Sequence, residues 1–267
     1  MRRAGIAATC GLGLALALSA APGRAPDRFR VYLPAAVQLD RPALRPRSAE
    51  ALVAALAVPG ARVEPAPGVY RLRRPAYLAA GVRFDAGGFA RVSGGRLELR
   101  TPVTITGQGL RIHDADGAAV LGVSIRGVSG DAVEAKGSAG VLLYGLDLSD
   151  AADGLFDLSG GARVTVRRSL FRDNVRGVLC GNWQAPADGR EYLALYDVRF
   201  ERVRVRTPKA QDCDVVAAGL VVLDAVEWPV DARGSSVVVL SGFEWSGRKI
   251  NPPGWRADQG AQVEVIP

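Results

Sequence analysis

Histidine is almost missing from this chain, since His113 is the single one among 267 residues. A metal site built on several histidines is therefore excluded. A Ser-His-Asp triad would have to use the segment IHDADG around His113, where nothing points to a partner nucleophile. We expect His113 to be an ordinary strand or turn residue.

Aromatic side chains are also scarce, at 6% of the chain, whereas Gly (32) and Pro (16) are plentiful. This composition is typical of many short elements joined by turns and speaks against long helices. The hydrophobic fraction of 48% is sufficient for a globular protein of one large domain or two small ones.

Long apolar runs are missing after residue 25, so we expect no membrane span in the mature chain. The first residues, MRRAGIAATCGLGLALALSAAPGRA, have two arginines, an apolar run from Ile6 to Leu18 and then small residues. This is the pattern of a secretory signal peptide, although a retained anchor is an alternative. We therefore expect residues 1–25 to be a signal peptide, residues 26–267 to form one domain, and the protein to be secreted or periplasmic.

The net charge of +7 falls to +4 when the three arginines at 2, 3 and 24 are removed with the signal (7 − 3). A moderately basic protein suits a polyanionic partner. Export favours an acidic polysaccharide over nucleic acid, and we expect a monomer.

Two of the three cysteines, Cys180 and Cys213, remain in the mature chain. In an oxidising compartment they could form a disulfide, and two buried thiols are the alternative.

A change of pattern divides the chain near residue 60. Before it, SAEALVAALAV predicts one short helix over 49–58 with Ser48 as its N-cap. After it, apolar and polar residues alternate with period two in short stretches broken by Gly, Pro or Asp, which predicts strands.

These strands can be laid over one another. Val141 aligns with Val164 after 23 residues, Val164 with Leu193 after 29, and Leu193 with Val221 after 28. The stretch VVLSGFEW then repeats the last of these strands 17 residues later. Such a loose repeat predicts an all-β solenoid of stacked coils, with a β-sandwich as the structural rival.

The stretch DAADGLFD places three carboxylates within eight residues. In an unbroken strand Asp153 and Asp157 would lie about 13 Å apart, but Gly154 would permit a bend. In stacked coils Asp131 would lie one level away, at about 4.8 Å, so three carboxylates could meet at one hard cation. The alternative interpretation is that Asp and Gly simply form turns here.

Four segments, DAV, ADGLFD, VTVRRSLFRDNVRGVLCG and FERVRVRTPKAQ, follow one another between Asp131 and Gln211, within residues 120–228. In order and spacing they resemble the core of the family 1 pectate lyases. The resemblance implies a right-handed parallel β-helix and a Ca²⁺ site made by Asp131, Asp153 and Asp157. Arg176 stands at the family's lysine, and Arg206 stands at its first arginine.

The resemblance implies β-elimination on a 1,4-linked polyuronate such as polygalacturonate. Arg206 would be the catalytic base, and Arg176 and Lys209 would bind substrate. An arginine base conflicts with its ordinary pKa, so it would need burial among other cations.

Three departures weaken the resemblance. An apolar stretch around Tyr144 replaces the family's WIDH element, Gln211 replaces a second arginine, and the family's later His and Asn positions are apolar. A non-catalytic β-helix that binds acidic glycans is therefore the alternative function. A β-helical hydrolase of the polygalacturonase type is disfavoured, because the chain has no Gly-His-Gly element.

Overall fold

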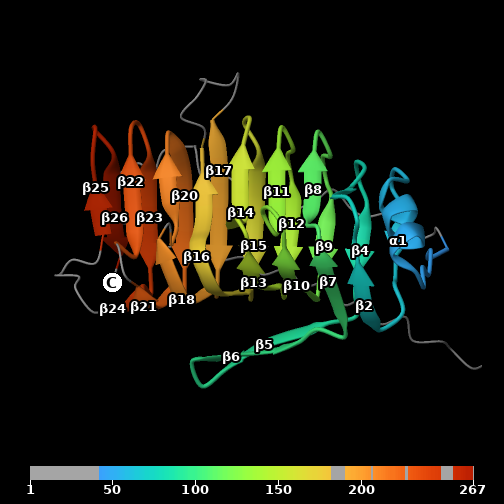
Figure 1. Cartoon of the computed structure of the whole chain (residues 1–267). Coiled ribbons are helices and arrows are strands. Elements are labelled where there is room, and N and C mark those ends of the chain that lie inside the picture. The colour runs from blue at the N-terminus through green and yellow to red at the C-terminus, as the bar shows by residue number, and fades with distance from the viewer. Residues whose placement is uncertain (1–41, 182–189, 206, 226–227, 248–254, 267) are drawn as a thin grey trace, which may run out of the picture. The chain divides into compact units, whose positions relative to one another are not determined.

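The computed structural model describes residues 42–181, 190–205, 207–225, 228–247 and 255–266. The predicted signal peptide and Arg206 lie outside these residues. The described residues form a parallel β-solenoid of about eight turns that follows a single short helix (Figure 1). This confirms the predicted parallel β-helix and rules out the β-sandwich, because strands of successive coils pair in parallel.

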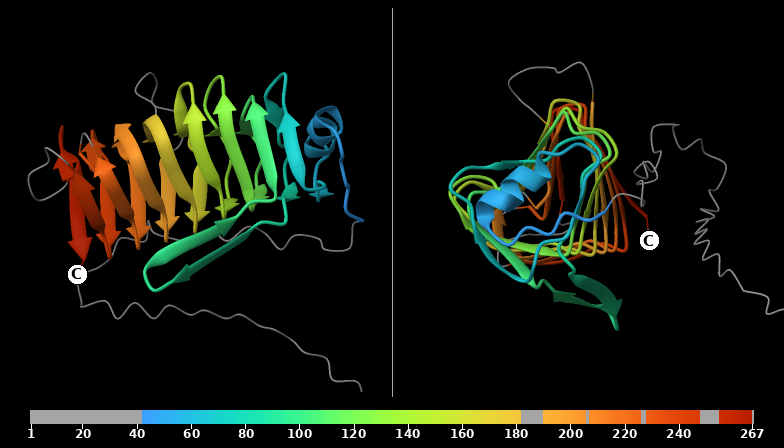
Figure 2. Two further views of the ribbon diagram at one scale, coloured as in Figure 1. Left: turned by 60° about the horizontal axis from the view of Figure 1, so that its bottom comes forward. Right: turned by 90° about the vertical axis from the view of Figure 1, so that its right-hand side faces the viewer.

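Each coil contributes one strand to each of three faces, which the end-on view of Figure 2 shows as a three-sided outline. The first face is formed by β1 (Arg62–Val63), β4 (Arg83–Asp85), β9 (Ala119–Leu121), β12 (Val141–Tyr144), β15 (Arg163–Arg167), β17 (Glu191–Tyr196), β20 (Cys213–Ala218), β23 (Val237–Ser241) and β26 (Gln262–Ile266).

The second face is formed by β2 (Gly68–Arg71), β7 (Val103–Gly107), β10 (Val123–Val128), β13 (Asp147–Ala151), the first part of β16 (Leu170–Cys180), β18 (Arg199–Val205), β21 (Val221–Ala225) and β24 (Glu244–Gly247). The third face is formed by β3 (Ala76–Tyr77), β8 (Leu110–His113), β11 (Val133–Lys136), β14 (Gly154–Ser159), the second part of β16, β19 (Lys209–Gln211), β22 (Val230–Arg233) and β25 (Trp255–Ala257).

The observed register tests the repeat read from the sequence. Val141 pairs with Val164, and Val164 pairs with Leu193, as predicted. The step from Leu193 to Val221 is wrong, because Leu193 pairs with Val215, only 22 residues later. Val221 belongs to the second face, so the 17-residue echo joined strands of different faces.

Helix α1 (Ala49–Leu56) covers the N-terminal end of the coil stack (Figure 2). The Ser48 hydroxyl accepts a hydrogen bond from the Ala51 N–H at 3.1 Å, which confirms the predicted N-cap. Leu52 and Leu56 are fully buried and close the end of the hydrophobic core. The helix ends two residues earlier than predicted.

The core is a column of side chains that stack from coil to coil. Phe171 of β16 pairs with Phe200 of β18, and their rings meet edge to face at 5.1 Å. Both side chains are fully buried. Since each coil buries its inner face only against its neighbours, these contacts determine the stability of the solenoid.

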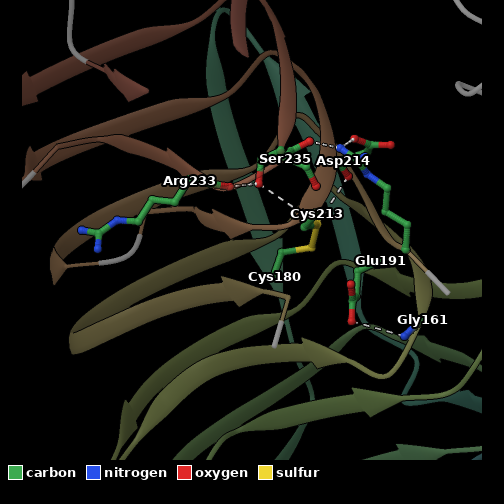
Figure 3. Close-up of a disulfide and its surroundings, with 9 residues drawn as sticks. Gly161, Cys180, Glu191, Cys213, Asp214, Arg233 and Ser235 are labelled. Carbon is green, nitrogen blue, oxygen red and sulfur yellow. Dashed lines mark hydrogen bonds and ion pairs between the residues drawn. A yellow bond between two sulfur atoms is a disulfide. The ribbon is translucent and has the colours of Figure 1, made fainter. Parts of the chain in front are cut away.

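A disulfide joins Cys180, at the end of β16, to Cys213, at the start of β20, with 5.8 Å between the two Cα atoms (Figure 3). Both residues are fully buried. The sequence left the pairing open, and the structure shows the bonded alternative. Within the described ranges no helix is long and apolar enough to cross a bilayer.

We expect Phe200→Ala to lower the free energy of unfolding by about 3–5 kcal/mol, because it leaves a cavity and removes the ring partner of Phe171. Urea unfolding followed by circular dichroism measures this loss. The control Val69→Ala, at a side chain that is 68% exposed, should change the free energy by less than about 0.5 kcal/mol. Equal effects of the two substitutions would contradict the stacked core.

Candidate active site

The candidate site lies at the corner between the second and third faces. Asp131 lies between β10 and β11, and Asp153 lies at the same corner in the next coil, between β13 and β14. In the next coil β16 continues through this corner as one strand, pairing first with β13 and then with β14. Residues that are 23 positions apart in the sequence therefore become neighbours here.

Four of the six predicted site residues line one pocket, which has an empty volume of about 250 Å³. They are the three aspartates Asp131, Asp153 and Asp157, together with Arg176. The rest of the lining is formed by Gly154, Phe156, Gly177 and Leu179.

Asp150, the first carboxylate of the DAADGLFD stretch, is not part of this lining and instead takes a left-handed backbone conformation (φ 51°). Asp153 itself lies in the bend between β13 and β14, and Asp157 lies within β14, so a place in a turn does not keep a carboxylate out of the pocket lining.

Gly154 allows the Asp131 carboxylate to enter the corner. The Asp131 Oδ1 atom accepts a hydrogen bond from the Gly154 N–H at 2.8 Å. A Cβ atom on residue 154 would lie 2.9 Å from this same oxygen. A side chain there would thus push the carboxylate out of the pocket.

Burial raises the pKa of Asp131 above its ordinary value, and the negative charges of Asp153 and Glu134 raise it further. The Gly154 hydrogen bond and the charge of Arg111 act in the opposite direction. Arg111 also donates to the Asp131 carbonyl oxygen at 3.1 Å. The site therefore concentrates negative charge that its own cations only partly compensate.

Arg176 forms an ion pair with Asp153, through Nη1 and Oδ1. The side chain of Asn174 forms three hydrogen bonds with the backbone of this corner. Its Oδ1 accepts a hydrogen bond from the Ala151 N–H at 3.0 Å, and its Nδ2 donates to the carbonyl oxygens of Asp153 (3.3 Å) and Arg176 (2.7 Å). Asn174 thus fixes the backbone that carries both members of the ion pair.

Asp157 lies further along β14, level with Glu134 in the preceding coil and with Leu179 in the following coil. Glu134 is held by Arg111 at 2.7 Å and lies 3.2 Å from His113 Nε2. The single histidine thus lies beside Glu134, on the neighbouring coil.

Of the last two predicted residues, only Lys209 is described, and it lies one coil further on. Lys209 of β19 pairs in register with Leu179 and is not part of the pocket lining. Arg206 lies outside the described residues, but Val205, which precedes it, is level with Arg176. The predicted roles of both residues stay predictions.

The three aspartates supply the hard oxygen donors that Ca²⁺ prefers, from two adjacent coils around one pocket. Across the described ranges, no three Asp, Glu, His or Cys side chains are grouped closely enough to hold a metal ion as they stand. The donor chemistry fits a calcium ion.

Sequence reasoning missed Asn174, Glu134 and Arg111 as parts of this site. The signal for Asn174 was available, because it stands 23 residues after Ala151, the same step that aligns the neighbouring strands. Glu134 and Arg111 become visible only from the register of β8, β11 and β14.

No family model and no curated protein matches this chain. Solved structures do match it. A pectate lyase from Bacillus sp. N165 in complex with trigalacturonate is 12% identical, with a TM-score of 0.61, over 83% of this chain and 82% of the other. This chain shares its fold with pectate lyases.

Two further structures show the same fold. The cedar pollen allergen jun a 1 is 14% identical, with a TM-score of 0.59, over 82% of this chain and 71% of the allergen. A pectate lyase variant from Xanthomonas campestris is 13% identical, with a TM-score of 0.55, over 85% and 81% of the two chains. The predicted likeness to pectate lyases is thus confirmed at the level of the fold.

The raised pKa of Asp131 predicts the sign of a pH effect. A carboxyl group whose pKa is higher in the folded than in the unfolded state destabilises the fold once it ionises. We expect Asp131→Asn, measured by urea unfolding in chelator, to match the wild type well below the ordinary value of 3.8. As the pH rises from this value through the raised pKa of Asp131, the variant should become more stable than the wild type. Above that pKa the difference between the two free energies of unfolding should stay constant.

Asp173 is the matched control, because its pKa is lowered, chiefly by hydrogen bonds from Arg202. Asp173→Asn should lose stability relative to the wild type at neutral pH and recover it as the pH falls through the lowered value. A loss of stability for Asp131→Asn at neutral pH would contradict the charge balance described for the pocket.

Proposed function

We propose that this protein is a secreted, Ca²⁺-dependent polysaccharide lyase that cleaves a 1,4-linked polyuronate, such as polygalacturonate, by β-elimination. One observation carries the proposal: Asp131, Asp153, Asp157 and Arg176, chosen from the sequence, come from three successive coils and line one pocket. The fold that brings them together is shared with solved pectate lyases. The trigalacturonate bound to one of these enzymes supports an acidic polysaccharide as substrate.

The three aspartates would hold the calcium ion. When bound, Ca²⁺ would act as a Lewis acid that stabilises the negative charge developing beside the substrate carboxylate. Arg176 would hold a substrate carboxylate through paired hydrogen bonds, exchanging its present partner Asp153 for the substrate.

Arg206 would take the proton from carbon 5 of the uronate. The electron pair of this C–H bond forms the double bond between carbons 4 and 5, and the C4–O bond breaks, so that the glycosidic oxygen leaves with its electron pair. No water is consumed, which distinguishes this reaction from hydrolysis. The base must be unprotonated, so we expect activity to rise toward alkaline pH.

A non-catalytic β-helix that binds acidic glycans is the second candidate. The Arg176–Asp153 ion pair supports it, because a guanidinium that already neutralises one aspartate lowers the need for a cation there. Binding of polygalacturonate without any turnover would support this second function.

We expect the wild type to release unsaturated products from polygalacturonate with Ca²⁺, seen as ultraviolet absorbance, and to stop when chelator is added. Arg206→Ala should lower kcat by about 10²–10⁴-fold because the base is lost. Arg176→Ala should lower kcat/KM by about 10²-fold.

Arg172→Ala is the matched control, since Arg172 pairs with Asp147 at 2.9 Å and is not part of the pocket lining. It should keep activity within about twofold of the wild type. Absence of product from both pectate and alginate would contradict the lyase function. A loss with chelator but not with Arg206→Ala would show that another residue is the base.

A further inference from the structure

An antiparallel hairpin leaves the solenoid between β4 and β7, within the second coil. It consists of β5 (Phe89–Ser93) and β6 (Arg96–Arg100), which form a separate two-stranded sheet. Figures 1 and 2 show it as an arm that projects from the coil stack. The pocket residues come from other coils and are not part of this arm.

The base of the arm is fixed to the solenoid. Gly88 packs so closely on Gly122 that a Cβ atom on residue 88 would lie 2.2 Å from the Gly122 carbonyl oxygen. The Tyr144 hydroxyl donates a hydrogen bond to the Ala90 carbonyl oxygen at 3.1 Å. Because an isolated hairpin is marginal in water, these contacts hold it in place.

The arm contributes little to the core of the solenoid. Ala90 is its single buried residue, while Phe89 is 50% exposed. The tip of the hairpin consists of Ser93, Gly94 and Gly95, all exposed. The Phe89 ring is therefore only partly covered by the protein and is accessible to a ligand.

The two faces of the arm differ in chemistry. Residues directly opposite each other in an antiparallel ladder share a face. One face carries the apolar pairs Ala90–Leu99 and Val92–Leu97, and the other carries Phe89–Arg100, Arg91–Glu98 and Ser93–Arg96. The second face therefore combines one aromatic ring with three arginines and a single carboxylate.

Two of the three arginines, Arg91 and Arg100, are neighbours of the Phe89 ring. The Arg91 guanidinium lies 5.9 Å from the centroid of the Phe89 ring and is paired with Glu98 at 2.6 Å. Arg100 lies opposite Phe89, and neither Arg100 nor Arg96 has an ion pair with any residue that the structure describes. Two cations on this face are thus available to anionic groups: Arg100 opposite the ring, and Arg96 nearer the tip of the arm, opposite Ser93.

We propose that this arm is a second binding surface for an acidic polysaccharide, separate from the pocket. A phenyl ring can pack on the apolar face of a sugar, and guanidinium groups bind carboxylates through paired hydrogen bonds. A membrane surface fits less well, because the tip of the arm, Ser93–Gly95, carries no apolar side chain that could enter the bilayer. The arm would keep a long polymer close to the protein whether or not the pocket turns it over.

Affinity electrophoresis in gels containing polygalacturonate and chelator tests this surface without catalysis. We expect the double variant Arg96→Gln/Arg100→Gln and the single variant Phe89→Ser each to bind about fivefold to tenfold more weakly than the wild type. The unfolding midpoint should stay within about 2 °C for both, since none of these side chains is buried.

The matched control is Arg47→Gln/Arg126→Gln, which removes two exposed arginines outside the arm. Its binding should weaken less than about twofold. An equal loss in control and arm variants would overturn the proposal, because binding would then follow net charge alone. The proposal would also be overturned if the arm variants bound polygalacturonate as well as the wild type does. This holds even if those variants lost binding to anionic phospholipid vesicles, because the arm would then be a membrane-binding surface.

The pocket variant Asp153→Ala separates this proposal from the lyase function. In the same gels it should retain polygalacturonate binding within about twofold. In the separate activity assay with Ca²⁺ it should lose any turnover. Loss of binding in Asp153→Ala with unchanged binding in the arm variants would place the polymer in the pocket alone and overturn the inference.

Discussion

In-register parallel stacking is the constraint on which the remaining structure depends. Each coil can bury its inner side chains only against the coils beside it, and neighbouring strands are held about 4.8 Å apart by backbone hydrogen bonds. The same stacking that brings Phe171 onto Phe200 in the core also places Asp131 beside Gly154 and Gly154 beside Arg176. One strand register therefore determines both which side chains pack in the core and which residues line the pocket.

Carboxylates that stack at this spacing repel each other, and the protein limits this repulsion with its own groups. The Gly154 N–H and Arg111 stabilise the charge of Asp131, and Arg176 neutralises Asp153. A bound calcium ion could replace these donors and cations as the partner of the aspartates, and a substrate carboxylate could replace Asp153 as the partner of Arg176.

Much of the fold could be predicted from local patterns. Period-two alternation identified the strands, Ser48 marked the start of the helix, and the 23-residue step matched the true register of Val141 with Val164. The alignment of strands failed where strands of two faces have similar sequences. Val221 was aligned with Leu193 but lies on the second face, whereas Leu193 pairs with Val215 on the first. Gly94 and Gly95 were a hairpin signal within the FARVSGGRLELR stretch that the strand pattern alone did not resolve.

The site was less predictable because it depends on contacts across coils. Order and spacing were sufficient to select four residues that share a pocket, whereas the pairing of Arg176 with Asp153 and the support from Asn174 require the three-dimensional register. The same holds for the disulfide, whose two cysteines come from adjacent coils 33 residues apart.

Calcium binding followed by isothermal titration calorimetry tests most directly whether adjacent coils build one site. Single variants Asp131→Asn and Asp157→Asn change carboxylates of different coils, so the account predicts one calcium ion per wild-type chain and an affinity at least about tenfold weaker in each variant. Calcium affinity that is unchanged in either variant would contradict the shared site.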